Sequence, residues 1–231
     1  STDSSKKTIW TDNATAAYWK PKARYEGDLG RIYGVQWRHW RTARTINTGS
    51  FKDEFGSYYS QQGGVSITEV DQLKQLIQGI KADPYGRRHI LSAWNPGELE
   101  AMALPPCHCF AQFYVQHRSG AARDALSCQM FQRSCDMFLG VPFNIASYSL
   151  LTAMLAHVCD LDVGEFVHTL GDAHIYLNHI EQVNEQLANE PLPAPQLWLN
   201  PDVKDIDKFT MDDIRLDGYT SHAAITAPMA V

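Results

Sequence analysis

The residues best suited to chemistry lie in the stretch LPPCHCF, from Leu104 to Phe110, where two prolines precede a Cys-His-Cys cluster. Cysteine and histidine side chains this close serve three kinds of chemistry: metal binding, disulfide formation, or nucleophilic attack by a thiol. The prolines restrict the backbone before Cys107 and would present its side chain in a fixed direction. The other residues of the sequence must distinguish among these three chemistries.

Metal binding is poorly supported by the spacing. A structural zinc site usually takes four ligands from two close pairs, but the other cysteines form no second pair (Cys128, Cys135 and Cys159). The H-x-E and P-C-x-x-C pattern of zinc deaminases does not fit either. The stretch HTLGDAHIY offers His168, Asp172 and His174, residues that more often form hydrogen bonds near the end of a sheet. We therefore expect no metal.

A nucleophilic thiol must be deprotonated near neutral pH, which requires nearby positive charge or hydrogen-bond donors. Arginine at 87, 88 and 133 could supply that charge and bind an anion, although a solvated surface is the commoner fate of a single arginine. On an extended segment Cys107 and Cys109 share a face, so local geometry decides which one reacts. Two buried packing cysteines are the remaining alternative.

Composition describes a folded chain of one domain, residues 1–231. The chain has 231 residues, 44% of them hydrophobic, and a formal net charge of -6. That charge argues against broad nucleic-acid binding, which needs a positive surface. The five cysteines are an odd number without regular spacing, and the first residues, STDSSKK, carry no apolar signal core. These features favour a reducing compartment, and we expect a cytoplasmic protein.

The pattern of residues predicts an α+β fold, with a mixed β-sheet covered by helices. The stretch 66–84 reads as an amphipathic helix, with Thr68 as its cap and Pro84 just past its end. Residues 144–161 are apolar but interrupted by polar side chains, which favours a buried helix over a membrane span. Other segments are expected as strands (88–94, 110–116, 126–133 and 165–170), a hairpin across 117–124, a helix over 174–190, a turn at 191–195, and short C-terminal strands.

Three long motifs favour the nucleophilic thiol over the other two chemistries. RRHILSAWNPGELEAMALPPCH, LSCQMFQRSCDMFLGVPFNIASY and FVHTLGDAHIYLNHIE strongly resemble the thymidylate synthase family, in the family's order and near its spacing. The resemblance extends through GDLGRIYGVQW and the closing APMAV, so it covers almost the whole chain. It implies reductive methylation of dUMP to dTMP, with methylenetetrahydrofolate as one-carbon and hydride donor and no metal.

The resemblance assigns the catalytic residues. Cys107 would attack the sixth carbon of the uracil ring and make the fifth carbon nucleophilic, which divides one hard step into easier ones. His108 would support the thiol, and Tyr33 would assist proton removal. Asn144 would read the base, because its amide has both a donor and an acceptor for the O4 and N3-H edge of uracil.

The resemblance also assigns the binding residues. The dUMP set is Arg87, Arg88, Gln132, Arg133, Ser134, Asp136, Asn144, His174 and Tyr176. In this set arginines 87 and 88 would reach the neighbouring subunit's site, so a homodimer with shared active sites is implied. The folate set is Trp10, Asn13, Leu104, Asp136, Gly140 and Val231. The plain alternative for Asp136 is a carboxylate that stabilises a turn.

One departure from the family concerns the start of the chain. The family usually has an extra segment before TIW that contributes a phosphate-binding arginine and a glutamate, and neither has a match here. We expect that the sequence is short relative to the natural protein. The alternatives to a thymidylate synthase are a pyrimidine nucleotide hydroxymethylase of the same superfamily, in which water captures the intermediate, and a non-catalytic nucleotide- or RNA-binding form. RNA binding itself is not predictable from this sequence.

Overall fold

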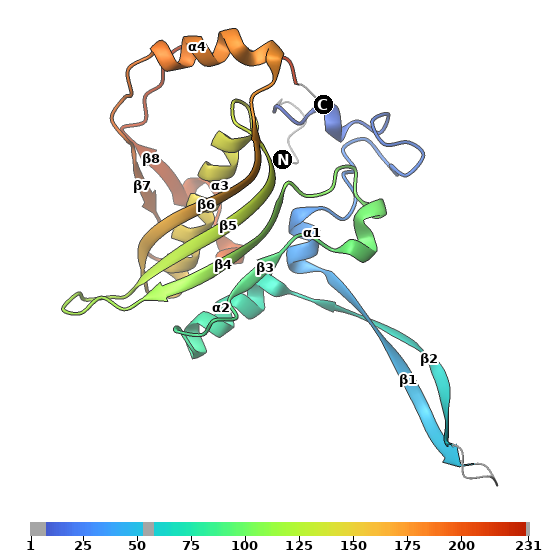
Figure 1. The fold of residues 1–231 in the computed structure, drawn as a ribbon. Helices are drawn as coiled ribbons and strands as arrows, with labels where there is room; N and C mark the ends of the chain where they lie inside the picture. The colour runs from blue at the N-terminus through green and yellow to red at the C-terminus, as the bar shows by residue number, and fades with distance from the viewer. Residues whose placement is uncertain (1–7, 53–57, 230–231) are drawn as a thin grey trace.

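A four-stranded mixed sheet forms the centre of the molecule (Figure 1). The computed structural model describes residues 8–52 and 58–229. In spatial order the strands are β3 (Ile90–Ser92), β4 (His108–Gln116), β5 (Ala125–Asp136) and β6 (Asp162–His174). The first three run antiparallel to their neighbours, and β6 joins β5 in parallel. The predicted α+β class, the four strands and the β4–β5 hairpin are confirmed.

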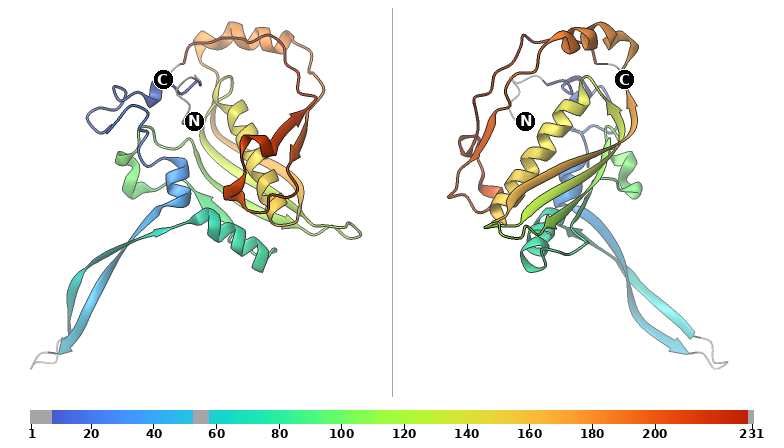
Figure 2. Two further views of the ribbon diagram at one scale, coloured as in Figure 1. Left: turned by 180° about the vertical axis from the view of Figure 1, so that it is seen from behind. Right: turned by 60° about the vertical axis from the view of Figure 1, so that its left-hand side comes forward.

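Helix α3 (Gly140–Val158) connects the parallel strands β5 and β6 and covers one face of the sheet (Figure 2). Two parallel neighbours need such a crossover. Tyr148 and Leu155 of α3 are buried against Phe113 and Met130 of the sheet. The helix is long and apolar enough to cross a membrane by length and composition alone. Its place in the core agrees with the predicted buried helix.

Helix α2 (Gln72–Ala82) is the predicted amphipathic helix, but its start was predicted wrongly. The N-cap is Asp71, whose carboxylate accepts a hydrogen bond from the Lys74 backbone N–H at 2.9 Å. Thr68 lies in a strand instead, where its hydroxyl bonds that of Thr42 across the pair. A threonine three residues before the cap fits either role, and pairing with the neighbouring strand decides between them.

A long two-stranded arm was not predicted at all. It consists of β1 (Trp40–Lys52) and β2 (Tyr58–Val70), which pair antiparallel and project away from the body (Figures 1 and 2). The short helix α1 (Tyr33–Arg38) precedes it. The base of the arm therefore lies beside Tyr33, a predicted catalytic residue.

The C-terminal part wraps around the outer side of α3 (Figure 2). The helix predicted over 174–190 is shorter: α4 spans Ile180–Ala188 and follows a single 3-10 turn, η3 (Leu177–His179). His174 lies outside it because it is still paired in β6, opposite Asp136. Residues 191–195 connect α4 to the expected short strands, and the remaining elements are β7 (Gln196–Leu199), η4 (Ile206–Lys208), η5 (Met211–Asp213) and β8 (Ile214–Asp217).

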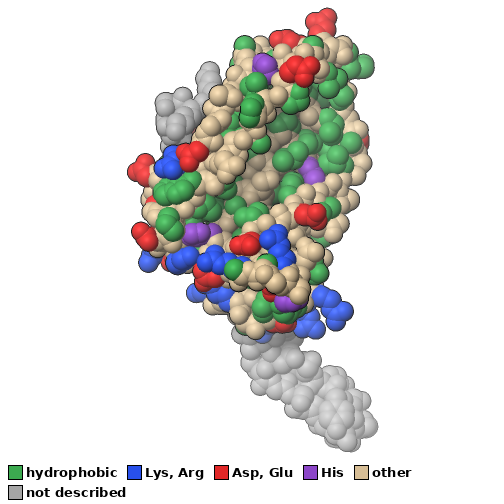
Figure 3. Space-filling model, turned by 90° about the vertical axis from the view of Figure 1, so that its left-hand side faces the viewer, with side chains coloured by type: hydrophobic (Ala, Val, Ile, Leu, Met, Phe, Trp, Pro, Cys, Tyr) green, Lys and Arg blue, Asp and Glu red, His purple; other side chains and the backbone are tan. Residues whose placement is uncertain are grey.

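The sheet face opposite α3 is open and carries both apolar and polar side chains. Side chains alternate along each strand, so residues that are not in the core face outward. Phe110 and Tyr114 of β4 and Val163 and Val167 of β6 are 43 to 57% exposed. Figure 3 shows many hydrophobic side chains on the upper part of one side of the body, with lysine and arginine gathered at its lower end.

Candidate active site

The Cys107 thiol lies where the polypeptide enters β4, between two other segments. Its backbone N–H donates to the Tyr33 hydroxyl at 3.0 Å, and its carbonyl accepts from the Arg133 backbone N–H at 2.8 Å. The first contact comes from α1 and the second from β5. The two prolines and these bonds fix the backbone, so the half-buried Cys107 side chain has a defined direction.

The Arg133 guanidinium fastens the same segment from the other side. Its Nε donates to the Pro106 carbonyl at 3.0 Å, and a terminal nitrogen donates to the Pro105 carbonyl at 2.9 Å. The group also lies over the Trp94 ring, 5.4 Å from its centroid. Arginine has five N–H donors, so donors remain for an anion. The sequence prediction that placed Arg133 near the thiol agrees with this geometry.

The Cys107 thiol is not activated in the isolated chain. Burial raises the pKa of Cys107, and the opposing effects of the Arg133 charge and the Tyr33 hydrogen bond do not cancel it. The expected cluster of three arginines around the thiol is incomplete here, because the pKa of Cys107 responds to Arg133 alone among them. Arg87 and Arg88 are exposed and line a hollow of about 650 Å³ beside α2.

Cys109 is distinguished from Cys107 by its surroundings. The register of β4 and β5 shifts between His108 and Phe110, so the two cysteines do not sit on one regular strand face. Cys109 is buried, and its Sγ lies 3.8 Å from the Pro106 carbonyl. It therefore packs in the core. All five cysteines are free thiols, so the disulfide interpretation is wrong for this structure.

Tyr33 is held against the thiol segment in an unusual backbone conformation. Its φ angle is +27°, in a region that residues with side chains rarely adopt. Its ring stacks on His108 with centroids 3.9 Å apart and planes 15° apart. Burial and the nearby Cys107 raise the pKa of the Tyr33 hydroxyl, so it stays protonated. It is a neutral group that can donate or accept a hydrogen bond.

His108 is a neutral imidazole deep in the site. Its Nδ1 is 2.8 Å from the Tyr148 hydroxyl. Burial, with a smaller effect of His168, lowers its pKa to about 3. The ring therefore takes part in hydrogen bonding and stacking, and it carries no charge at neutral pH.

This burial predicts a pH dependence of stability. In the unfolded chain His108 takes up a proton below pH 6.5, whereas in the folded chain it stays neutral down to about 3. Its contribution to the free energy of unfolding is therefore complete above pH 6.5 and declines as the pH falls toward 3. The free energy of unfolding, measured in urea at several pH values across this range, should change less steeply with pH in His108→Gln than in the parent. The same dependence on pH in both proteins would contradict the assigned neutral state of His108.

A chain of amides orients Asn144. His168 Nε2 lies 3.0 Å from the Gln132 side-chain oxygen, and the Gln132 amide donates to the Asn144 Oδ1 at 3.0 Å and to the Ser134 carbonyl at 2.9 Å. Gln132 and Asn144 are buried. Because Asn144 Oδ1 already accepts, the Asn144 Nδ2 group points elsewhere as a donor, and one lone pair of Oδ1 stays available.

The parallel pairing of β5 and β6 gathers the other predicted dUMP residues. Ser134 lies opposite Asp172, and Asp136 lies opposite His174, whose ring meets that of Tyr176 edge-on at 5.1 Å. His174 Nδ1 is 3.2 Å from the Asp172 carbonyl. Within residues 8–52 and 58–229, no group of His, Cys, Asp and Glu is arranged to hold a metal ion.

The predicted folate residues are partly brought together around the start of α3. The Trp10 ring meets Phe143, the neighbour of Asn144, edge-on at 5.4 Å. Asp136 accepts hydrogen bonds from the Phe138 and Leu139 backbone N–H groups at 3.1 and 3.2 Å, so it does stabilise a turn. Of the other predicted folate residues, Asn13 is buried and Leu104 is half-buried. Gly140 begins α3 beside Asp136, and Val231 lies outside the described residues.

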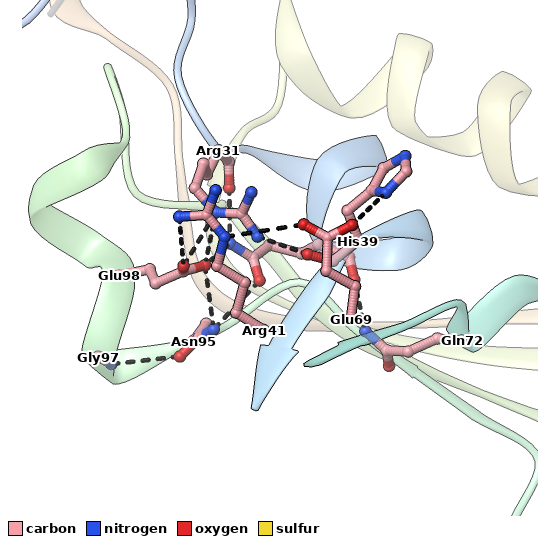
Figure 4. Close-up of polar contacts among 9 residues, drawn as sticks. Arg31, His39, Arg41, Glu69, Gln72, Asn95, Gly97 and Glu98 are labelled. Carbon is pink, nitrogen blue, oxygen red and sulfur yellow. Dashed lines mark hydrogen bonds and ion pairs between the residues drawn. The ribbon is translucent and has the colours of Figure 1, made fainter. Parts of the chain in front are cut away.

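Sequence reasoning missed four polar residues that lie behind Tyr33: Arg31, Gln36, Asn95 and Glu98. Their side chains form one hydrogen-bonded cluster between the Tyr33 loop, by which we mean residues 29–33 at the start of α1, and the segment leading to Cys107 (Figure 4). The motifs GDLGRIYGVQW and NPGELE contain all four. The only signal was the presence of charged and amide residues in otherwise apolar motifs, which does not reveal their contacts.

Comparison with known proteins now identifies the family. The family described as "Thymidylate synthase" matches residues 2–231. The chain belongs to the thymidylate synthase family. It is 52% identical over 226 residues to "Bifunctional dihydrofolate reductase-thymidylate synthase 2" of Arabidopsis thaliana, covering 96% of this chain and 36% of that protein. It is 51% identical over 226 residues to the bifunctional dihydrofolate reductase-thymidylate synthase of Glycine max, covering 96% and 39%.

Family membership agrees with the architecture described above. The mixed sheet with helices is the fold that the thymidylate synthase resemblance implied. The chain spans less than two fifths of the length of these two relatives. The matched part is therefore a thymidylate synthase domain, and its activity, substrates and partners are argued below as proposals.

Proposed function

We propose that this thymidylate synthase domain converts dUMP to dTMP, with methylenetetrahydrofolate as one-carbon and hydride donor. The observation that carries the proposal is the position of Cys107, held between the Tyr33 hydroxyl and the Arg133 guanidinium in a chain of this family. A thiol so placed has a proton-transfer group on one side and a positive charge on the other. That is what attack on an electron-poor ring carbon requires.

Asn144 supplies selectivity for the base. Its Nδ2 donates to O4 of uracil, and the free lone pair of Oδ1 accepts from N3-H. The hydrogen bond from Gln132 keeps the amide in this orientation. A cytosine edge presents a donor in place of O4, so it would oppose the Nδ2 donor.

Exchange of Asn144 for aspartate tests base selection. In Asn144→Asp the carboxylate offers no donor to O4 but can partner the cytosine edge, so the ratio of kcat/KM for dUMP to that for dCMP should fall at least about tenfold. The measurement is the steady-state rate with each nucleotide in turn. Ser147→Ala, on an exposed part of the same helix, is the control and should keep the parent ratio. An unchanged ratio in Asn144→Asp would remove this residue from base reading.

The arginines that bind the phosphate of dUMP complete the positive surroundings of the thiol. Arg133 contributes the N–H donors that the proline carbonyls leave free, and Ser134 lies next to it on β5. Arg87 and Arg88 come from a second copy of the chain. In the dimer these arginines add positive charge around Cys107, which lowers the pKa of Cys107 that burial raises in the isolated chain.

The second copy docks on the open face of the sheet. That face carries the exposed Phe110, Tyr114, Val163 and Val167, and burial of such a patch favours association. A two-fold axis then repeats each arginine pair in both sites. The homodimer with shared sites is therefore part of the proposal. No membrane partner is proposed, and cytoplasmic location stays a prediction.

The folate binds beside the base, at the start of α3. Trp10 offers an aromatic ring there, and Asp136 can accept from a pterin edge with the oxygen that the turn leaves free. Gly140 begins α3 at this surface, and a Cβ on it would make only ordinary van der Waals contact with Asp136, at 3.6 Å. When bound, the folate supplies the carbon and the hydride. Leu104 and Asn13 are assigned to the folate by the resemblance alone.

Dihydrofolate formation tests the proposal directly. The purified chain is mixed with dUMP and methylenetetrahydrofolate, and the absorbance of dihydrofolate is followed. A rise that depends on dUMP supports the methylation. Mass analysis of the nucleotide separates the rival hydroxymethylase, which adds a hydroxymethyl group and forms no dihydrofolate. Binding of dUMP without any product would favour the non-catalytic form.

A further inference from the structure

The backbone strain at Tyr33 raises the question of what holds it. A side-chain-bearing residue at φ +27° is unfavourable and persists only when its surroundings determine it. Hydrogen bonding of its hydroxyl to Cys107 occurs at the far end of the side chain. Besides this bond and the stacking of the ring on His108, the residues that flank Tyr33 along the chain can hold the strained backbone itself.

Residues on both sides of Tyr33 in the chain donate hydrogen bonds to one carboxylate, that of Glu98 (Figure 4). On one side, Arg31 Nε donates to both carboxylate oxygens of Glu98 at 2.9 Å. On the other side, Gln36 Nε2 donates to Glu98 Oε2 at 2.8 Å and to the Arg31 carbonyl at 2.8 Å. Asn95 Nδ2 donates to Gln36 Oε1 at 3.2 Å and to Glu98 Oε2 at 3.3 Å. We call these four residues the Glu98 cluster.

The Glu98 cluster also anchors the segment that carries Cys107. Glu98 lies on the 3-10 helix η2 (Pro96–Ala101), and the chain runs from there through the two prolines to Cys107. Beside it, the Arg31 backbone N–H donates to the Ala101 carbonyl at 2.9 Å. The Tyr33 loop and the Cys107 segment thus meet at Glu98, at the backbone contacts of residues 29–31 with residues 101–103, and at the thiol.

Burial makes this contact strong and selective for a carboxylate. The Arg31 and Glu98 side chains are only 15% and 16% exposed, and Gln36 is fully buried. Burial acts to raise the pKa of Glu98, but the hydrogen bonds from Gln36 and Arg31 bring it below its usual range. Glu98 is therefore charged, and donors face both of its oxygens. A carboxamide would turn an NH2 group toward one of them.

We propose that Glu98 is a positioning residue of the active site, which, through Arg31 and Gln36, holds the strained Tyr33 loop in register with Cys107. The role of Tyr33 in turnover rests on the proposed function. The geometry at Cys107 does not depend on the proposed function. The positioning role of Glu98 and the proposed function can therefore be tested separately.

A matched control is available at the edge of the same network. Glu69, at the base of the arm, accepts from His39 at 2.8 Å and faces Arg41 at 3.8 Å, but its side chain is 46% exposed (Figure 4). Ion pairs this exposed contribute little. Glu69→Gln makes the same chemical change as Glu98→Gln in the same neighbourhood, and it leaves the buried bonds to Arg31 and Gln36 intact.

The experiment compares Glu98→Gln, Glu69→Gln, Tyr33→Phe and the Glu98→Gln/Tyr33→Phe double variant. The first readout is the pH profile of Cys107 alkylation by iodoacetamide without substrates, assigned to that side chain by fragment mass spectrometry. Among the described residues, the groups that shift the pKa of Cys107 are Arg133 and Tyr33. The second readout is kcat and KM for dUMP. Thermal unfolding checks that each variant is folded.

In Glu98→Gln the alkylation profile should move to higher pH, as in Tyr33→Phe, because the Tyr33 hydrogen bond lowers the pKa of Cys107. Displacement of a catalytic group by an ångström costs on the order of a hundredfold, so kcat should fall about that much while KM for dUMP stays within about threefold. The double variant should be no worse than Tyr33→Phe, since Glu98 acts through Tyr33. Glu69→Gln should match the parent in both readouts.

The proposal is overturned if Glu98→Gln keeps the parent alkylation profile, or if it costs as much in the Tyr33→Phe background as alone. Should Glu98→Gln fail to fold, Arg31→Lys replaces it, because lysine keeps the charge but loses the planar guanidinium whose Nε donates to both Glu98 oxygens. That variant should give a smaller shift in the same direction, and no shift would also overturn the proposal. If the parent shows no turnover, the proposed function fails while the alkylation profiles still decide the role of Glu98.

Discussion

Cys107→Ser should lose turnover by more than about a thousandfold, because the thiolate is the attacking group and a serine hydroxyl is a far weaker nucleophile near neutral pH. The substitution removes little volume. The backbone bonds of this residue to Tyr33 and Arg133 do not involve its side chain, so fold and dUMP binding should persist. The measurements are the rate of dihydrofolate formation, dUMP affinity by calorimetry, and thermal unfolding.

Cys109→Ser is the control for this prediction. Cys109 is two residues away and buried in the core, where it packs near the Pro106 carbonyl. We expect this variant to keep activity within about tenfold of the parent and to be somewhat less stable, since oxygen is smaller than sulfur and leaves part of the core space unfilled. Loss of turnover in Cys109→Ser with full turnover in Cys107→Ser would show that the other thiol is the nucleophile.

Two inactive subunits should restore activity when they are paired. One carries Cys107→Ala and the other carries Arg87→Ala with Arg88→Ala, and the two are unfolded and refolded together. If the arginines serve the partner's site, a mixed dimer has one site with both defects and one site with neither. Random pairing makes half of the dimers mixed, so about a quarter of all sites should recover. The readout is turnover per site against the refolded parent.

A second arginine pair provides the control for subunit mixing. Arg118 and Arg123 belong to the turn between β4 and β5, and Arg118 pairs with Asp162 at 3.4 Å. Subunits with alanine at both positions should be active alone, so their mixture with Cys107→Ala shows only the expected dilution. Activity of the first mixture that stays at the level of the separate mutants would mean that Arg87 and Arg88 serve their own subunit's site.

The strands and the core helix were predictable from local pattern, and the arm was not. The strands β4 and β5 are rich in aromatic and alternating apolar residues, and α3 is a long apolar stretch interrupted by single polar side chains. The segment of the arm lacks that contrast, because a two-stranded ribbon has no core face for its side chains to share. Thr68 was assigned to the wrong element for the same reason.

The site was predictable in position but not in its electrostatics. Motif resemblance placed Cys107, Tyr33, Arg133 and Asn144, and the structure brings the first three into contact. It could not show that burial would raise the pKa of Cys107 in a single chain, because that depends on what surrounds the thiol in space. Nor could it reveal the role of Glu98, because its partners Arg31 and Gln36 lie more than sixty residues away in the sequence.

Covalent capture of the nucleotide tests the central claim most directly. The chain is mixed with dUMP and methylenetetrahydrofolate, quenched with denaturant during turnover, digested, and examined by mass spectrometry. The account predicts a peptide whose mass includes the nucleotide, with fragment ions that place it on Cys107, and no such peptide when dUMP is omitted. A nucleotide found on Cys109, or dTMP formed at full rate by Cys107→Ser, would contradict it.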